Sequence, residues 1–192
     1  KLRILTLGPL TNLAQALAHK RLNERIESVY VMGGAVDVPG NIAGSPGGPQ
    51  DNTTAEWNVF VDPAALASVL DAGLSVRLVY LDGTDQVPLT RTFAGRVQDV
   101  ATAAPLSVLA ELLAKNDHMT SGSFYLWDAI AAVVAAGFPV AEFSDAHLTV
   151  DVTDGTTSGT TRRADGPTNA GYTSKADAGT IEQLLISVMN AG

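Results

Sequence analysis

The chain of 192 residues contains no cysteine, and this absence excludes several kinds of chemistry. Without cysteine the protein forms no disulfide bonds, offers no thiolate ligands to a metal ion and has no cysteine nucleophile. The absence does not identify the compartment in which the protein works. No hydrophobic run approaches the roughly 18 residues that a membrane-spanning helix needs, so the sequence predicts no membrane partner.

Basic residues are also scarce. The chain has 12 Lys and Arg residues against 20 Asp and Glu residues, and its formal net charge is −8. Without a basic stripe there is no surface suited to a phosphate backbone, so we expect no nucleic-acid partner. The histidines at positions 19, 118 and 147 are dispersed and lack the spacing of a helical metal site, and we interpret them as surface or structural residues.

The residues that are present predict a single α/β domain over 1–192. A chain that is 46% hydrophobic and 17% charged is typical of globular proteins. Apolar runs rich in β-branched residues predict strands at 4–7, 28–32, 76–81 and 147–153. Helical patterns occur at 10–17, 62–70, 90–100, 105–115, 128–136 and 176–190. This alternation predicts a doubly wound, mainly parallel sheet flanked by helices, in which ligands bind at the carboxyl ends of the strands.

Two further features concern loops and the start of the chain. Residues 37–55 are rich in glycine and proline and form the one long irregular stretch, and a loop of that length in a compact domain is usually functional. A buried type of strand begins almost at residue 1, without an initiator Met or an entry loop. We therefore expect the chain to be part of a longer protein.

Glu56 and Asn58 are the first candidate ligand-binding pair. In an extended segment, side chains at i and i+2 point to the same face. Glu accepts hydrogen bonds from hydroxyl groups and Asn both donates and accepts, so the pair fits a vicinal diol. The alternative is that both residues are simply polar side chains at a solvated strand edge.

Asp128 is a second candidate, because it opens the apolar helix predicted at 128–136. An isolated Asp at a helix start is more often a cap or a first-turn acid that suits the helix dipole. Leu7 ends the first predicted strand, just before the turn Gly8-Pro9. From the residues alone, this segment is a plain connection between a strand and a helix.

Taken in order, these segments resemble the C-terminal part of the nucleoside hydrolase family, whose members cut the N-glycosidic bond of ribonucleosides with a bound calcium ion. The matching segments are Gly33-Gly34, Gly40-Asn41, Ala55-Glu56-Trp57-Asn58, Asp62-Pro63 and Tyr125-Leu126-Trp127-Asp128-Ala129, and the likeness extends to a late hairpin near 155–162. The resemblance implies a ribonucleoside substrate, with Asn41, Glu56 and Asn58 as ribose contacts. It also implies Ca²⁺ as cofactor, with Asp128 and the backbone carbonyl of Leu7 as ligands.

Trp127 distinguishes two types within this resemblance. The inosine–uridine type usually has His before the metal-binding Asp, whereas the purine-specific type has Trp there, stacking on the base. This chain has Trp127, and Trp57 between the two ribose residues also resembles the purine-specific type. The resemblance therefore implies a purine nucleoside, with Tyr125 lining the mouth of the same site. The alternative is that Trp127 only packs into the core.

One part of the family pattern is absent. Members carry an N-terminal cluster of the form D-x-D-x-x-x-D-D, which supplies most calcium ligands and the general base, and these 192 residues do not contain it. We therefore assign no catalytic residue here and expect the chain alone to be inactive. A second hypothesis is a non-catalytic domain that binds a nucleoside or sugar, or that forms a homo-oligomer.

Overall fold

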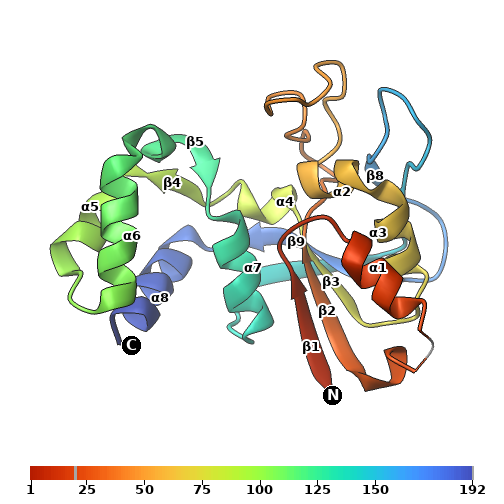
Figure 1. Ribbon diagram of the computed structural model, residues 1–192, viewed down its shortest axis with the longest axis horizontal. Coiled ribbons are helices and arrows are strands. Elements are labelled where there is room, and N and C mark those ends of the chain that lie inside the picture. Colours follow the sequence, from red (N-terminus) through yellow and green to blue (C-terminus); the bar gives the residue numbers. More distant parts are fainter. Residues whose placement is uncertain (20, 192) are drawn as a thin grey trace.

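The computed structural model describes residues 1–19 and 21–191, and its centre is a five-stranded sheet (Figure 1). The strand order is β1 (Leu2–Thr6), β2 (Ile26–Met32), β3 (Val76–Val79), β9 (Ala170–Ala176) and β6 (Ala141–Ala146). The first four strands run parallel, and β6 pairs antiparallel with β9. The predicted mainly parallel α/β sheet is therefore confirmed.

Helices cover both faces of this sheet. On one face, α1 (Thr11–Leu17) and α3 (Pro63–Leu70) bury Leu13 and Leu66 against β2 and β3. On the other face, α7 (Trp127–Ala135) and α8 (Ala178–Ala191) bury Ile130 and Ile181 against the sheet. Each strand of a doubly wound sheet is covered on both sides, which explains why β2 and β3 read as nearly continuous apolar runs.

A helical lobe stands beside the sheet, on the left of Figure 1. It contains α5 (Arg91–Val100), α6 (Ala104–Lys115), the 3-10 helix η2 (Asp117–Thr120) and the strand pair β4 (Pro88–Thr90) and β5 (Ser121–Tyr125). Phe93, Val97 and Leu106 form its buried core. The lobe positions the site because β5 leads directly into α7.

Short elements complete the chain. They are the 3-10 helix η1 (Asn23–Arg25), α2 (Trp57–Val61), α4 (Leu81–Thr84), β7 (Leu148–Val150) and β8 (Thr161–Arg163). Helix α3 begins where the sequence predicts, because Asp62 caps it through a 3.0 Å bond from the Ala65 N–H and Pro63 occupies the first position. Within the ranges that the structure describes, no helix is long and apolar enough to span a membrane.

The strand predicted at 147–153 is wrong in length and in partner. Only Leu148–Val150 is extended, and it pairs with β8 in a separate hairpin rather than joining the central sheet. The fourth parallel strand is β9, which the sequence analysis missed. The predicted strand at 76–81 also ends early, at Val79, because the N–H groups of Gly83 and Thr84 turn back to the Tyr80 carbonyl and start α4.

Candidate active site

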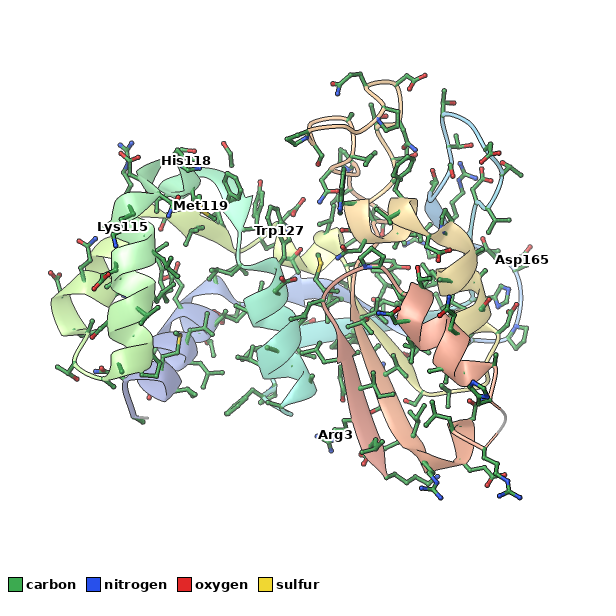
Figure 2. All side chains as sticks on the ribbon, viewed as in Figure 1. Arg3, Lys115, His118, Met119, Trp127 and Asp165 are labelled. Atoms are coloured by element: carbon green, nitrogen blue, oxygen red, sulfur yellow. The ribbon has the colours of Figure 1, made fainter. Side chains whose placement is uncertain are left out.

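A cleft of about 320 Å³ opens where β1 and β2 end, between the long loop, α2 and the start of α7. Figure 2 shows Trp127 at the end of α7 that lies between the helical lobe and the central sheet. The cleft is lined by Leu7, Met32, Ser45, Glu56, Trp57, Asn58, Phe124, Trp127 and Asp128. Its place at the carboxyl ends of parallel strands is where such sheets bind ligands.

The cleft brings together most of the side chains that the sequence analysis singled out, but it does not include two of them. Asn41 lies beside the cleft, where its Oδ1 accepts a 2.8 Å hydrogen bond from the N–H of Trp57. Tyr125 lies behind Trp127, with ring centroids 5.5 Å apart and ring planes tilted by 46°. In this structure Asn41 supports the start of α2, and Tyr125 supports the indole.

Glu56 is the N-cap of α2 rather than part of an extended pair. The expectation that Glu56 and Asn58 share a strand face is wrong, because α2 begins at Trp57 and Asn58 lies in its first turn. Glu56 Oε2 accepts hydrogen bonds from the N–H groups of Gly34 (3.0 Å) and Val59 (3.2 Å). The Glu56 side chain is thereby fixed, and only 2% of the residue is exposed.

Glu56 and Asn58 nevertheless meet beside Gly33, which has a φ of +152°. A Cβ at Gly33 would lie 3.0 Å from Glu56 Oε2 and 3.4 Å from the Asn58 Cβ. Glycine is therefore required here by both the backbone conformation and the close approach. The Gly33-Gly34 turn, predicted as a strand end, brings the chain against the Glu56 carboxylate.

One acceptor atom on each of these two side chains remains available in the cleft. Asn58 Nδ2 donates to the Met32 carbonyl at 3.1 Å, and Asn58 Oδ1 remains available to accept a hydrogen bond. Glu56 Oε2 accepts from the two backbone N–H groups, and Glu56 Oε1 remains available as an acceptor. Asn58 Oδ1 has no hydrogen-bond partner within 1–19 and 21–191, and the backbone N–H of Asn58 also interacts with the Glu56 carboxylate. Burial raises the pKa of Glu56, and the N–H bonds to its carboxylate oppose that rise.

Asp128 lies in the first turn of α7 and does not cap it. The N-cap position is Leu126, and no side chain caps the helix. Burial raises the pKa of the Asp128 carboxyl. Asp128 and Leu7 line the same cleft, so hard oxygen donors of the kind that calcium prefers occur there.

The number of such donors is small. Calcium takes about six to eight oxygen ligands, and in the described part of the chain no three His, Cys, Asp or Glu side chains form a metal-binding group. The donors therefore fit calcium in kind and supply only part of a coordination shell.

Trp127 belongs both to the core and to the cleft. It packs against the core that α7 forms with the sheet. It also lines the cleft, beside Phe124 at a centroid distance of 6.2 Å. Its indole Nε1 donates to Asp85 Oδ1 at 3.4 Å. Trp57, which is 37% exposed, also faces the cleft, so both tryptophans of the chain line it.

Sequence reasoning missed several residues at this site. Met32 and Phe124 line the cleft but look like ordinary apolar residues of strands. Ser45 lines it from the long loop, where only the loop's length was a signal. His118, labelled in Figure 2, meets the Phe124 ring edge-on with centroids 6.1 Å apart, so it lies behind the cleft wall.

The long loop 37–55 is held by the hairpin of β7 and β8. Asn52 is fully buried, its Nδ2 donates to the Ser158 carbonyl at 2.8 Å, and its Oδ1 accepts from the Ala55 N–H at 3.1 Å. The hydroxyl groups of Thr54 and Thr160 lie 2.6 Å apart. These contacts fix the chain immediately before Glu56, so the hairpin supports one wall of the cleft.

Known proteins resemble this chain in sequence. Residues 1–183 match the family described as inosine-uridine preferring nucleoside hydrolase. Nucleoside hydrolase 3 of Arabidopsis thaliana is 28% identical over 145 residues, which are 71% of this chain and 16% of that protein. The pyrimidine-specific ribonucleoside hydrolase RihA of a Shewanella species is 37% identical over 107 residues, which are 55% of this chain and 30% of that protein.

Solved structures show the same fold. An inosine-uridine preferring nucleoside hydrolase from Bacillus anthracis superposes with a TM-score of 0.84 at 26% identity, over 99% of this chain and 60% of that one. A purine-preferring ribonucleoside hydrolase from Gardnerella vaginalis gives a TM-score of 0.79 at 24% identity, over 99% of this chain and 60% of that one. The present chain thus spans less than two thirds of the length of each of these relatives.

The family match extends over nearly the whole sequence, and the fold agrees with it independently. This chain belongs to the inosine-uridine preferring nucleoside hydrolase family.

Proposed function

We propose that this chain carries the ribose-binding half of an enzyme that hydrolyses ribonucleosides to ribose and free base. The observation that carries the proposal is that Glu56, Asn58 and Asp128 line one cleft, with Glu56 Oε1 and Asn58 Oδ1 not used by the bonds that fix the two side chains to Gly34, Val59 and Met32. We use the term complete enzyme for a protein that contains these 192 residues and has the full length of the relatives.

The geometry supports specific roles in binding ribose. Glu56 Oε1 accepts hydrogen bonds from ribose hydroxyl groups, and Asn58 Oδ1 accepts a second, because both atoms are held by bonds made elsewhere on the same side chains. The Asn41 amide group, whose Oδ1 serves α2, offers its Nδ2 as a donor at the rim. Cleavage of the glycosidic bond builds positive charge on the ribose ring, which the Glu56 carboxylate stabilises.

We further propose that Asp128 and the Leu7 carbonyl contribute to a calcium site in the complete enzyme. Both residues line the cleft, and their oxygens suit a hard cation. A bound calcium ion lowers the pKa of a coordinated water. One carboxylate and one carbonyl do not make a tight site, so calorimetry on residues 1–192 alone is expected to show no sub-micromolar calcium affinity.

The aromatic wall of the cleft supports a purine base. Trp57 and Trp127 provide planes on which a bicyclic base stacks better than a single ring. Base–aromatic stacking is worth roughly 1–3 kcal/mol, which corresponds to about ten- to hundredfold discrimination. The names of the relatives include both pyrimidine-specific and purine-preferring enzymes, so the choice of base depends on the particular cleft. We propose that the substrates are inosine, adenosine or guanosine.

A second candidate is a domain that binds nucleosides without cleaving them. The small number of acidic ligands around Asp128 within the described ranges favours this for the chain in isolation. Incubation of inosine with the complete enzyme, followed by chromatography, distinguishes the two. Release of hypoxanthine and ribose supports hydrolysis, and inosine that is bound but unchanged supports the second candidate. We expect residues 1–192 alone to release no hypoxanthine.

A further inference from the structure

Asp85 contacts the tryptophan of the cleft from outside the cleft. It follows α4, where its N–H bonds to the Leu81 carbonyl at 2.9 Å, and its carboxylate Oδ1 accepts from the Trp127 Nε1 at 3.4 Å. Asp85 does not line the cleft, and the roles proposed above do not use it.

The segment that carries Asp85 is firmly placed. Gly83 packs so closely against Thr173 of β9 that a Cβ at Gly83 would lie 2.8 Å from the Thr173 Cβ. The Thr173 hydroxyl also accepts from the Tyr80 N–H at 2.9 Å. Asp85 is therefore tied to the central sheet and can act as a fixed acceptor.

The bond to Asp85 engages the one polar atom of the Trp127 indole, Nε1. Indole has a single hydrogen-bond donor, so a bond from Nε1 to a fixed carboxylate sets the direction of the ring plane. Tyr125 and Phe124 flank the same ring and limit its other movements. A negatively charged acceptor also strengthens the bond and raises the electron density of the ring, which favours stacking on an electron-poor base.

We propose that Asp85 is a positioning residue for base recognition: through the indole N–H it holds Trp127 in the orientation on which the purine stacks, and so sets the preference for purines. This inference rests on the proposed function of the cleft. The competing explanation is a purely structural bond that joins α4 to α7.

The contact itself is tested on the 192-residue chain without substrate. Two indole N–H signals are expected in its NMR spectrum, and the variant Trp57→Phe assigns the one from Trp127. Asp85→Ala is expected to shift the Trp127 signal and to leave that of Trp57 in place. Asp99→Ala, which removes an exposed acid of α5, is the matched control and should shift neither. An unchanged Trp127 signal in Asp85→Ala would overturn the inference.

The role in recognition is tested in the complete enzyme by comparing kcat/KM for inosine and uridine. Asp85→Ala is expected to lower the inosine-to-uridine ratio by about five- to tenfold, the scale of one lost hydrogen bond of ordinary strength. Asp85→Asn, which keeps an oxygen acceptor, should retain most of the ratio. In a Trp127→Phe background, where the indole N–H is gone, Asp85→Ala should have no further effect.

The outcomes separate the inference from the proposed function. An equal loss for both substrates, or an effect that persists in the Trp127→Phe background, would show that Asp85 is only structural. If the wild-type enzyme hydrolysed neither nucleoside, the proposed function would fall and the role in base preference with it. The NMR result would still decide whether Asp85 holds the indole.

Discussion

Replacing Glu56 by Gln separates the binding role of its carboxylate from its structural role. In the wild type, Oε2 accepts from the N–H groups of Gly34 and Val59, which leaves Oε1 for a ligand in the cleft that Glu56 lines. The amide oxygen of Gln can take over the two backbone bonds, which places its NH₂ group where Oε1 was. That group donates and carries no charge, so it cannot accept from a ribose hydroxyl.

Glu56→Gln is expected to lower kcat/KM for inosine by a factor of about 10²–10³, which corresponds to about 3–4 kcal/mol of transition-state stabilisation. The free energy of unfolding should change by less than about 1 kcal/mol, because the capping bonds survive. Steady-state kinetics in the complete enzyme and urea unfolding measure the two quantities. Glu111→Gln is the control, since that side chain is 73% exposed on α6 and should change neither quantity.

Glu56→Ala should behave differently from Glu56→Gln. It removes the N-cap and leaves two buried N–H groups without an acceptor, which is expected to destabilise the fold by about 2–5 kcal/mol. This substitution should therefore cost stability as well as activity. If Glu56→Gln kept kcat/KM within about threefold of the wild type, the ribose assignment would be refuted. Equal stability of the two variants would refute the capping role.

Four further predictions concern the ribose site, the base site, the long loop and an exposed ion pair. Asn58→Ala should lower kcat/KM for inosine about 100-fold in the complete enzyme, and a near-wild-type value would contradict its role at the ribose. Trp127→Ala should erode a wild-type preference for inosine over uridine of about ten- to hundredfold, and equal kcat/KM values in the wild type would rule out the purine assignment. Thr160→Val removes the hydroxyl that bonds to the long loop, so the free energy of unfolding should fall by about 1 kcal/mol, and an unchanged urea midpoint would exclude that contact. The guanidinium of Arg163 holds the pKa of Asp37 below its ordinary value of 3.8, so this pair stabilises the fold above that pH and stops doing so as pH falls through the lower folded pKa. In Asp37→Asn, the free energy of unfolding should therefore fall less on acidification than in the wild type, by a difference of less than about 1 kcal/mol. Identical pH profiles of the two proteins would show that the pair does not stabilise the fold.

Much of the fold could be predicted because the inner strands of the sheet have a clear apolar sequence pattern. Most residues of β2 and β3 are buried between the two helical layers, so their sequences are mainly apolar, with Glu27, Ser28 and Arg77 as the polar exceptions. β9 could not be found in this way, since Ala170–Ala176 consists largely of small and polar residues. It is a strand because β3 and β6 pair with it on either side, and such tertiary pairing overrides local propensity.

The candidate site likewise has features that the sequence predicts and features that depend on tertiary packing. The order of the motifs predicts Glu56, Asn58, Trp127 and Asp128, and the rule that ligands bind at strand ends predicts that they meet. The capping role of Glu56 was not predicted, because a five-residue helix leaves almost no periodic signal. The contact between Asp85 and Trp127 joins positions 42 residues apart and depends on how α4 and α7 pack. Sequence spacing carries no information about such a bond.

The central claim is that the cleft between α2 and α7 is the ribonucleoside site. A crystal structure of the complete enzyme with ribose bound tests it most directly. Ribose hydroxyl groups are expected within hydrogen-bond distance of Glu56 Oε1 and Asn58 Oδ1, with the sugar C1 facing Trp127. Ribose bound elsewhere, with this cleft left empty, would contradict the claim.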